Sequence, residues 1–176
     1  IGVPKTIDND LCLTDHTPGY GSSAKYISTI LKEVIRDSSV YDIRSVTVAE
    51  IMGRHAGWLA GAACLAGGDD CEGPDLILLP EVLFYQDKFL AKVDELQRRK
   101  SNVIIAASEG VKTADGTYLC DLLSTAGQLD AFGHKAVLSG TSRYLSDLIH
   151  DKLNCKSRAI EFSTLQDAAA HGLKIV

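Results

Sequence analysis

Three short apolar segments, separated by stretches with helical periodicity, constrain the fold of this chain more than any other feature. They have the aliphatic composition of strands that are buried on both faces of a sheet, and they lie at residues 44–51, 75–79 and 103–107. Apolar side chains recur at helical spacing in the intervening and preceding stretches, at residues 22–37, 58–66 and 86–100. This alternation predicts an α/β fold, with a mostly parallel sheet flanked by helices.

The remaining segments have shorter patterns that extend this prediction. Residues 1–4 are expected to be the end of a strand, and Ser22 or Ser23 is expected to cap the first helix. The elements expected toward the carboxyl end are a short helix near 121–129, a helix at 141–152, a strand at 157–162 and a final helix from about Thr164. The 176 residues are enough for one domain with a substantial core.

Composition excludes several classes of partner. The net charge of −5 argues against nucleic acid, because phosphate backbones attract Lys and Arg. Five cysteines without CxxC spacing are typical of reduced thiols, so we expect a cytoplasmic protein. No apolar run is long enough to span a bilayer, so we expect no membrane partner.

The predicted strand ends carry polar side chains where a ligand would bind, since ligands of parallel α/β sheets lie beyond the carboxyl ends of the strands. Met52, Gly53 and Arg54 follow one strand, and Glu81 and Glu109 follow two others. The glycine allows close approach of backbone to a ligand, the guanidinium matches phosphate, and the next helix offers N–H groups to an anion. The alternatives are that Arg54 pairs with a neighbouring carboxylate, and that Glu109 is a carboxylate at the positive end of a helix dipole.

A second polar cluster is the sequence PKTIDND at residues 4–10. Asp8 and Asp10 are two positions apart, so an extended backbone would point both carboxylates the same way. Such a pair suits a general base beside a metal or a second charge, and Lys5 could neutralise a transferring phosphoryl group. The alternatives are a polar turn and a solvated lysine. A base, a cation and phosphate-holding groups together suit phosphoryl transfer to a hydroxyl.

Three segments carry a family resemblance: PKTIDND at residues 4–10, TDHTPGYG at 14–21 and EIMGRHAGW at 50–58. With them the chain resembles the 6-phosphofructokinase family over most of its length. The resemblance implies Mg²⁺-dependent phosphoryl transfer to the 1-hydroxyl of fructose 6-phosphate, giving fructose 1,6-bisphosphate in glycolysis. It also implies a homo-oligomer, whose sugar site can borrow residues from a neighbouring subunit.

The resemblance implies roles for the first cluster. Asp8 would be the base that takes the proton from the sugar hydroxyl, with Thr6 and Ile7 lining the sugar site beside it. Asp10 would assist near the metal and phosphate end. Lys5 is typical of members that use pyrophosphate, where it would stabilise the transferred group, although some members that use ATP also carry a lysine there.

The resemblance implies substrate-binding roles at the strand ends. Met52, Gly53 and Arg54 would hold the sugar, and Arg54 would also face the transferred phosphate. Glu109 would bind sugar hydroxyls, and Arg158 would grip the 6-phosphate.

The chain also departs from the family pattern. The glycine-rich half that binds the phosphoryl donor precedes PKTIDND in the family, so we expect residues 1–176 to be a single fragment, mainly the fructose 6-phosphate domain. The main Mg²⁺ ligand would then lie in the absent half, and the fragment alone would be inactive. The letters GGDD at residues 67–70 match a donor loop of the family but lie at a helix end, and we interpret them as a coincidence. Asp167 stands where relatives tend to carry an arginine.

Two other functions compete with this interpretation. An aspartyl-phosphate phosphatase also uses an Asp-x-Asp pair, but it needs an apolar strand before the first aspartate, which residues 4–6 do not provide. A non-catalytic sugar-phosphate-binding or assembly module would keep Arg54, Glu109 and Arg158 in use while Asp8 was dispensable.

Overall fold

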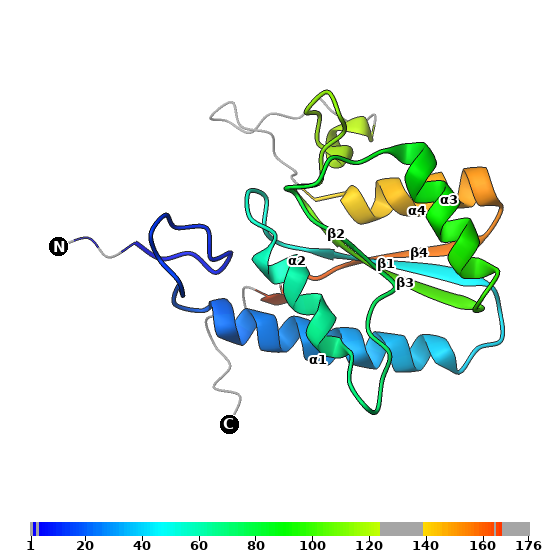
Figure 1. Ribbon diagram of the computed structural model, residues 1–176, viewed down its shortest axis with the longest axis horizontal. Coiled ribbons are helices and arrows are strands. Elements are labelled where there is room, and N and C mark those ends of the chain that lie inside the picture. Colours follow the sequence, from blue (N-terminus) through cyan, green and yellow to red (C-terminus); the bar gives the residue numbers. More distant parts are fainter. Residues whose placement is uncertain (1, 3, 124–138, 164, 167–176) are drawn as a thin grey trace.

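The computed structural model describes residues 2, 4–123, 139–163 and 165–166. Its regular elements alternate along the chain as helices and strands (Figure 1). In order they are α1 (Tyr20–Ser39), β1 (Ser45–Ile51), α2 (Trp58–Ala62), the 3₁₀ turn η1 (Ala63–Ala66), β2 (Leu76–Leu78), α3 (Gln86–Gln97), β3 (Asn102–Ser108), the 3₁₀ turn η2 (Leu119–Leu122), α4 (Thr141–Leu153) and β4 (Lys156–Glu161).

The described strands form one four-stranded sheet in the order β2-β3-β1-β4, and every pair is parallel. The α/β fold predicted from the sequence is therefore confirmed. The register pairs Ser45 with Asn102 and Ile51 with Ser108, so that β1 and β3 end side by side at the centre of the sheet. The segments that follow these two strands must therefore start from neighbouring points.

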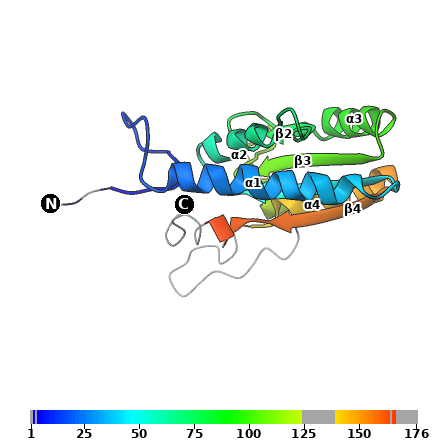
Figure 2. The same cartoon turned by 90° about the horizontal axis from the view of Figure 1, so that it is seen from below.

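Helices cover both faces of the sheet (Figures 1 and 2). On one face Ile27 and Leu31 of α1 pack with Leu59 of α2, and on the other Val93 of α3 packs with Ile149 of α4, all within cores of buried residues. The side chains of β1 alternate between these two cores, as a strand buried on both faces requires. Among the described residues, no helix is long and apolar enough to cross a membrane.

The start of α1 differs from the prediction. The helix begins at Tyr20 and neither Ser22 nor Ser23 caps it, because Gly19 is the N-cap residue, with a left-handed φ of 92°. The Ser23 N–H donates to the Gly19 carbonyl at 3.0 Å, which extends the helix toward the amino end. Glycine adopts this conformation without the steric cost of a Cβ, so the glycine here takes the place that a serine cap was expected to fill.

Other predicted elements are shorter than expected or lie partly outside the described residues. The helix expected at 58–66 continues as the 3₁₀ turn η1 from Ala63. The helix expected at 121–129 is represented by η2, and residues 124–129 lie outside the described residues. The final helix from Thr164 also lies largely outside them. Of residues 1–4, positions 2 and 4 are described and neither is in a strand.

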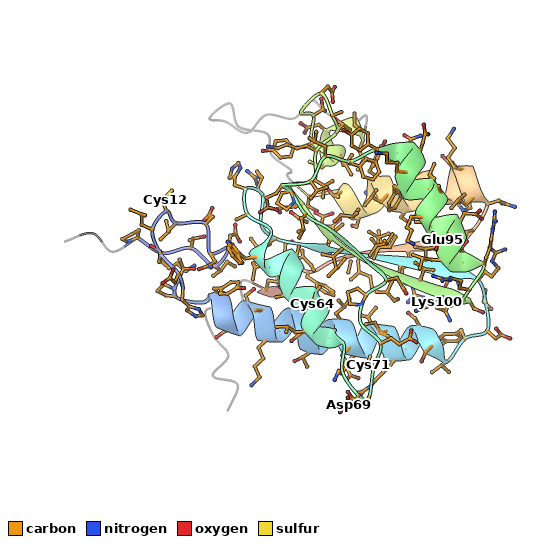
Figure 3. All side chains as sticks on the ribbon, in the orientation of Figure 1. Cys12, Cys64, Asp69, Cys71, Glu95 and Lys100 are labelled. Atoms are coloured by element: carbon orange, nitrogen blue, oxygen red, sulfur yellow. The ribbon has the colours of Figure 1, made fainter. Side chains whose placement is uncertain are left out.

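The loop at residues 67–75 is held by ion pairs to neighbouring elements. Asp70 pairs with Lys32 at 2.9 Å and with Arg36 at 2.6 Å, both on α1. Lys100, labelled with Asp69 in Figure 3, pairs with Asp75 at 2.9 Å. These bonds give the GGDD segment a local structural role, consistent with its interpretation as a coincidence.

All five cysteines have free thiols. Figure 3 places Cys12 on the amino-terminal loop, Cys64 on η1 and Cys71 on the loop that follows it. The fold is therefore stabilised without a disulfide.

Candidate active site

The turns that follow β1 and β3 touch each other through their backbones. Gly53 has φ 120°, and a Cβ on it would lie 2.6 Å from the Ala56 carbonyl oxygen. A Cβ on Gly110 would collide with the carbonyl oxygen of Arg54. Neither position leaves room for a side chain: Gly53 permits the tight turn after β1, and Gly110 permits the contact between the two turns.

This contact brings together the arginine and the glutamate that the sequence placed at the strand ends. A guanidinium nitrogen of Arg54 lies 3.9 Å from a carboxylate oxygen of Glu109. The arginine side chain is 32% exposed and the glutamate side chain 11% exposed, so the pair is accessible from the arginine side. At this distance the ion pair is loose. Arg54 therefore pairs with a neighbouring carboxylate, as one alternative expected, and its guanidinium is still accessible to a ligand.

Burial raises the pKa of the Glu109 carboxyl from 4.5 to about 7. The negative charges of Asp8 and Glu50 raise it as well, while the Arg54 guanidinium and the Gly53 N–H lower it. A carboxyl group with this pKa is present in both protonation states near neutral pH. It can therefore accept a hydrogen bond from a hydroxyl or donate one.

The amino-terminal loop is organised by Asn9. Its side chain is buried, accepts from the backbone N–H and the hydroxyl of Thr17 at 2.9 and 3.2 Å, and donates to the Asp15 carbonyl at 3.2 Å. Its φ of 60° is left-handed, so the backbone between Asp8 and Asp10 is not extended. The expected alignment of the two carboxylates is therefore wrong, because it required an extended strand at this residue.

The two aspartates lie in different environments. Asp8 is partly buried, its N–H donates to the Thr6 hydroxyl at 3.2 Å, and its charge acts on Glu109. Ile7, directly before Asp8, is 5% exposed and therefore holds this part of the loop against the domain. Asp10 is exposed, as is Lys5. Asp8 is thus the aspartate that is coupled electrostatically to the strand-end site.

The amino end of α2 is occupied by a carboxylate of the chain itself. Gly57 is the N-cap residue of α2, and its N–H donates to Glu81 Oε1 at 2.7 Å. The carboxylate side chain of Glu81 reaches it from the segment after β2. The Glu81 carboxylate therefore occupies one of the N–H groups at the start of this helix and acts there as a helix cap.

Arg158 lies away from this group. It pairs with Thr47 in the sheet register, four positions before the end of β1, and its guanidinium is 3.9 Å from Asp37 on α1. The residue lines a cavity of about 220 Å³ with Tyr41, Ile43 and others from the amino end of the sheet. The structure therefore does not bring Arg158 and Arg54 to one site within this chain.

Sequence reasoning missed two residues beside the strand ends. Glu50 is 4% exposed, and its carboxylate accepts from the N–H of Ser142 at 2.7 Å and of Gly140 at 3.2 Å, at the start of α4. Burial raises the pKa of this carboxyl. Ser108, the last residue of β3, is completely buried and bonds both turns. A polar residue inside an apolar strand segment was the signal that could have identified each.

Within the described part of the chain, no three His, Cys, Asp or Glu side chains are placed together to hold a metal ion.

Comparison with known proteins identifies the family. The family model described as phosphofructokinase matches residues 1–171. This chain belongs to the phosphofructokinase family.

Individual relatives agree with this assignment. The chain is 43% identical over 173 residues to a pyrophosphate–fructose 6-phosphate 1-phosphotransferase of Xanthomonas campestris, with 97% of this chain and 40% of that protein aligned. A protein of the same name from Halomonas elongata is 42% identical, again with 97% of this chain and 40% of that protein aligned. The crystal structure of a pyrophosphate-dependent phosphofructokinase from Marinobacter aquaeolei superposes with a TM-score of 0.76 and 35% identity, covering 96% of this chain and 38% of that one. The chain thus spans about 40% of the length of the curated phosphofructokinase relatives it matches.

The raised pKa of Glu109 predicts a pH-dependent stability difference. A carboxyl whose pKa rises on folding contributes stability below its unfolded pKa and loses it as pH rises through about 7. Glu109→Gln mimics the protonated form, so the variant should gain stability relative to the parent from about pH 5 to about pH 8, by at most about 3 kcal/mol. Urea unfolding at both pH values measures this.

Glu95→Gln is the matched control, because Glu95 is exposed on α3 and Lys92 lowers its pKa. The Glu95→Gln variant should not gain stability relative to the parent as the pH rises from about 5 to about 8. Equal pH profiles for the two variants would contradict the assignment of a raised pKa to Glu109.

Proposed function

We propose that this chain forms the sugar-phosphate site of an enzyme that transfers a phosphoryl group from pyrophosphate to the 1-hydroxyl of fructose 6-phosphate, giving fructose 1,6-bisphosphate. The observation that carries the proposal is the juxtaposition of Arg54, Glu109 and the charge of Asp8 at the carboxyl ends of β1 and β3. An anionic sugar needs a cation, hydroxyl-binding carboxyl groups and a base, and these three residues supply them.

Glu109 and Arg54 act on the sugar itself. Glu109 exchanges hydrogen bonds with sugar hydroxyls, which its pKa of about 7 allows in either protonation state. Arg54, which is loosely paired and one-third exposed, turns from Glu109 to the phosphoryl group that is transferred. Met52 and Gly53 support the sugar from the turn, where Gly53 allows close approach of the backbone.

The amino-terminal loop supplies the proton acceptor. Asp8 takes the proton from the 1-hydroxyl as that oxygen attacks the phosphorus atom in line with the leaving phosphate. Thr6 and Ile7 line the site beside it, Asp10 assists at the phosphate end, and Lys5 stabilises the charge of the transferred group.

Arg158 is proposed to bind the 6-phosphate, and its position constrains how. Because it lies four register positions before the end of β1 and its guanidinium lies beside Asp37 of α1, we propose that it completes the Arg54 site of a second copy and not that of its own chain. The proposal for Arg158 therefore includes a homo-oligomer in which one chain supplies this arginine to another.

Pyrophosphate is proposed as the donor, with ATP as the alternative. Support comes from Lys5 and from the names of the relatives, which are pyrophosphate-dependent phosphotransferases. Since the aligned part is about 40% of those relatives, we propose that the donor is bound by residues outside these 176 and that this chain alone does not turn over.

Magnesium is proposed as a requirement of the whole enzyme, with its main ligand also outside this chain. The steps above are those of this chain's own residues, and the metal would neutralise charge on the transferred phosphoryl group. We further propose a cytoplasmic enzyme without nucleic acid or membrane partners, in keeping with the net charge of −5 and the free thiols.

A direct test is fructose 6-phosphate binding to the purified chain by calorimetry. Arg54→Ala and Glu109→Ala should each weaken binding by about tenfold or more, because each removes a hydrogen-bonding partner of the sugar in a partly buried site. Arg98→Ala is the control, since Arg98 is the C-cap residue of α3 and its side chain is 75% exposed. Equal affinities for Arg54→Ala and Arg98→Ala would contradict the proposed sugar site.

Asp8→Asn separates an enzyme from a non-catalytic sugar-phosphate module. In a protein that carries this chain together with a donor-binding part, the substitution should lower kcat by about 10²–10⁴-fold, the usual contribution of a general base. Fructose 6-phosphate binding should stay within about threefold, since the carboxamide keeps the size of the side chain. Unchanged turnover in Asp8→Asn would favour the binding module.

A further inference from the structure

The hydroxyl of Ser108 joins the two turns that carry the site. Ser108 Oγ donates to the Gly53 carbonyl oxygen at 2.6 Å and accepts from the Gly110 N–H at 2.9 Å. The residue is fully buried and stands opposite Ile51, where β1 and β3 end. A serine hydroxyl has one hydrogen to donate, and here it is given to the turn of the neighbouring strand.

Glu109 has backbone anchors that do not depend on this hydroxyl. Its N–H donates to the Ile51 carbonyl at 2.9 Å, and its carbonyl accepts from the Thr141 hydroxyl at 3.2 Å. The glutamate backbone is therefore held to β1 and to the start of α4. Loss of the Ser108 hydroxyl would leave these two bonds in place.

The turn that carries Arg54 depends more on Ser108. The Met52 N–H donates to the Gln166 side chain at 3.2 Å. The carbonyl of the following residue, Gly53, accepts from the Ser108 hydroxyl. Without the hydroxyl, a buried carbonyl would lack this donor, and the turn would shift to satisfy it. The Gly110 N–H beside Glu109 would lose its acceptor as well, but the two backbone anchors of Glu109 remain, so Arg54 would move further than Glu109.

We propose that Ser108 is a positioning residue of the sugar-phosphate site: its hydroxyl sets the separation of Arg54 and Glu109, and with it the affinity for fructose 6-phosphate. The inference rests on the proposed function for the identity of the ligand, whereas the hydrogen bonds of Ser108 are a property of the protein alone. At 3.9 Å the Arg54–Glu109 pair is at the outer limit of an ion pair, so a shift of the turn away from Glu109 would break the pair. A site that must hold a sugar between both groups is sensitive to the same shift.

The protonation of Glu109 reports this separation without any ligand. The charged groups that act on it are Arg54, which lowers its pKa, and Asp8 and Glu50, which raise it. If Arg54 moves away, the two carboxylates remain and the pKa of Glu109 rises above about 7. A merely structural role for Ser108 would lower stability and leave this titration in place.

The experiment compares Ser108→Ala with Ser146→Ala. Ser146 is a buried serine of α4, so the control also removes one buried hydroxyl. The Glu109 carboxyl is followed by carbon-13 NMR between about pH 5 and pH 9, with its signal assigned from Glu109→Gln, and fructose 6-phosphate affinity is measured by calorimetry. We expect Ser108→Ala to raise the Glu109 titration midpoint and to weaken sugar binding by about tenfold, and Ser146→Ala to leave both at the parent values.

An unchanged Glu109 midpoint in a folded Ser108→Ala chain would overturn the inference. If the alanine variant does not fold, Ser108→Cys replaces it, because a thiol has similar size and is only a weak donor; it should shift the midpoint in the same direction, and an unshifted midpoint would again overturn the inference. If the parent chain does not bind fructose 6-phosphate, the proposed function fails, while the Glu109 titration still decides the role of Ser108.

Discussion

The backbone contact between the turns after β1 and β3 is the constraint on which the site depends. The parallel register ends both strands at the same level, with Ile51 opposite Ser108. Gly110 then lets its turn meet the backbone of Arg54 without a side chain between them, while Gly53 allows the tight turn that carries Arg54. The contact places Arg54 beside Glu109, because Glu109 precedes Gly110 in the sequence. A larger residue at Gly110 would separate the two charged groups.

Buried carboxylates surround this contact and are only partly compensated. Glu50 accepts two backbone N–H groups at the start of α4, and Glu109 faces one loosely paired arginine. Burial raises the pKa of both carboxyl groups. A charge arrangement of this kind costs stability unless a ligand or a proton relieves it, and it is typical of sites that bind polar ligands. The hydrogen bonds that Glu50 accepts also explain why the N-cap residue of α4 can be Gly140, which has no side chain to cap the helix.

The regular elements could be predicted from the sequence because their signals are local. Helix α1 has strong apolar periodicity, and strands β1 and β3 are mainly apolar runs. The rule that ligands lie at the carboxyl ends of parallel strands then pointed to Arg54 and Glu109. The predictions that were wrong involve backbone conformations that periodicity does not encode. Asn9 turns the chain left-handed between Asp8 and Asp10, and Gly19 starts α1 before the serines.

Long-range contacts set the other limit. In the sequence, Glu50 and Ser108 are polar residues without an evident partner. In the structure, Glu50 accepts from the start of α4 and Ser108 donates to the Gly53 turn. Glu81 follows a strand end, as a ligand-binding residue would, yet it caps α2. The distance of Arg158 from Arg54 depends on the register of β4 against β1, which no single segment reveals. Pairings between segments far apart in the chain therefore decided which strand-end residues form one site.

The most direct test of the account is a crystal structure of the chain with fructose 6-phosphate. The account predicts the sugar ring at the carboxyl ends of β1 and β3, with hydroxyls hydrogen-bonded to Glu109 and the 1-hydroxyl directed toward Asp8. If a second copy is present in the assembly, its Arg158 should approach the 6-phosphate. A sugar bound only in the cavity beside Arg158 and Tyr41 of its own chain, with the Arg54–Glu109 pair untouched, would contradict the account.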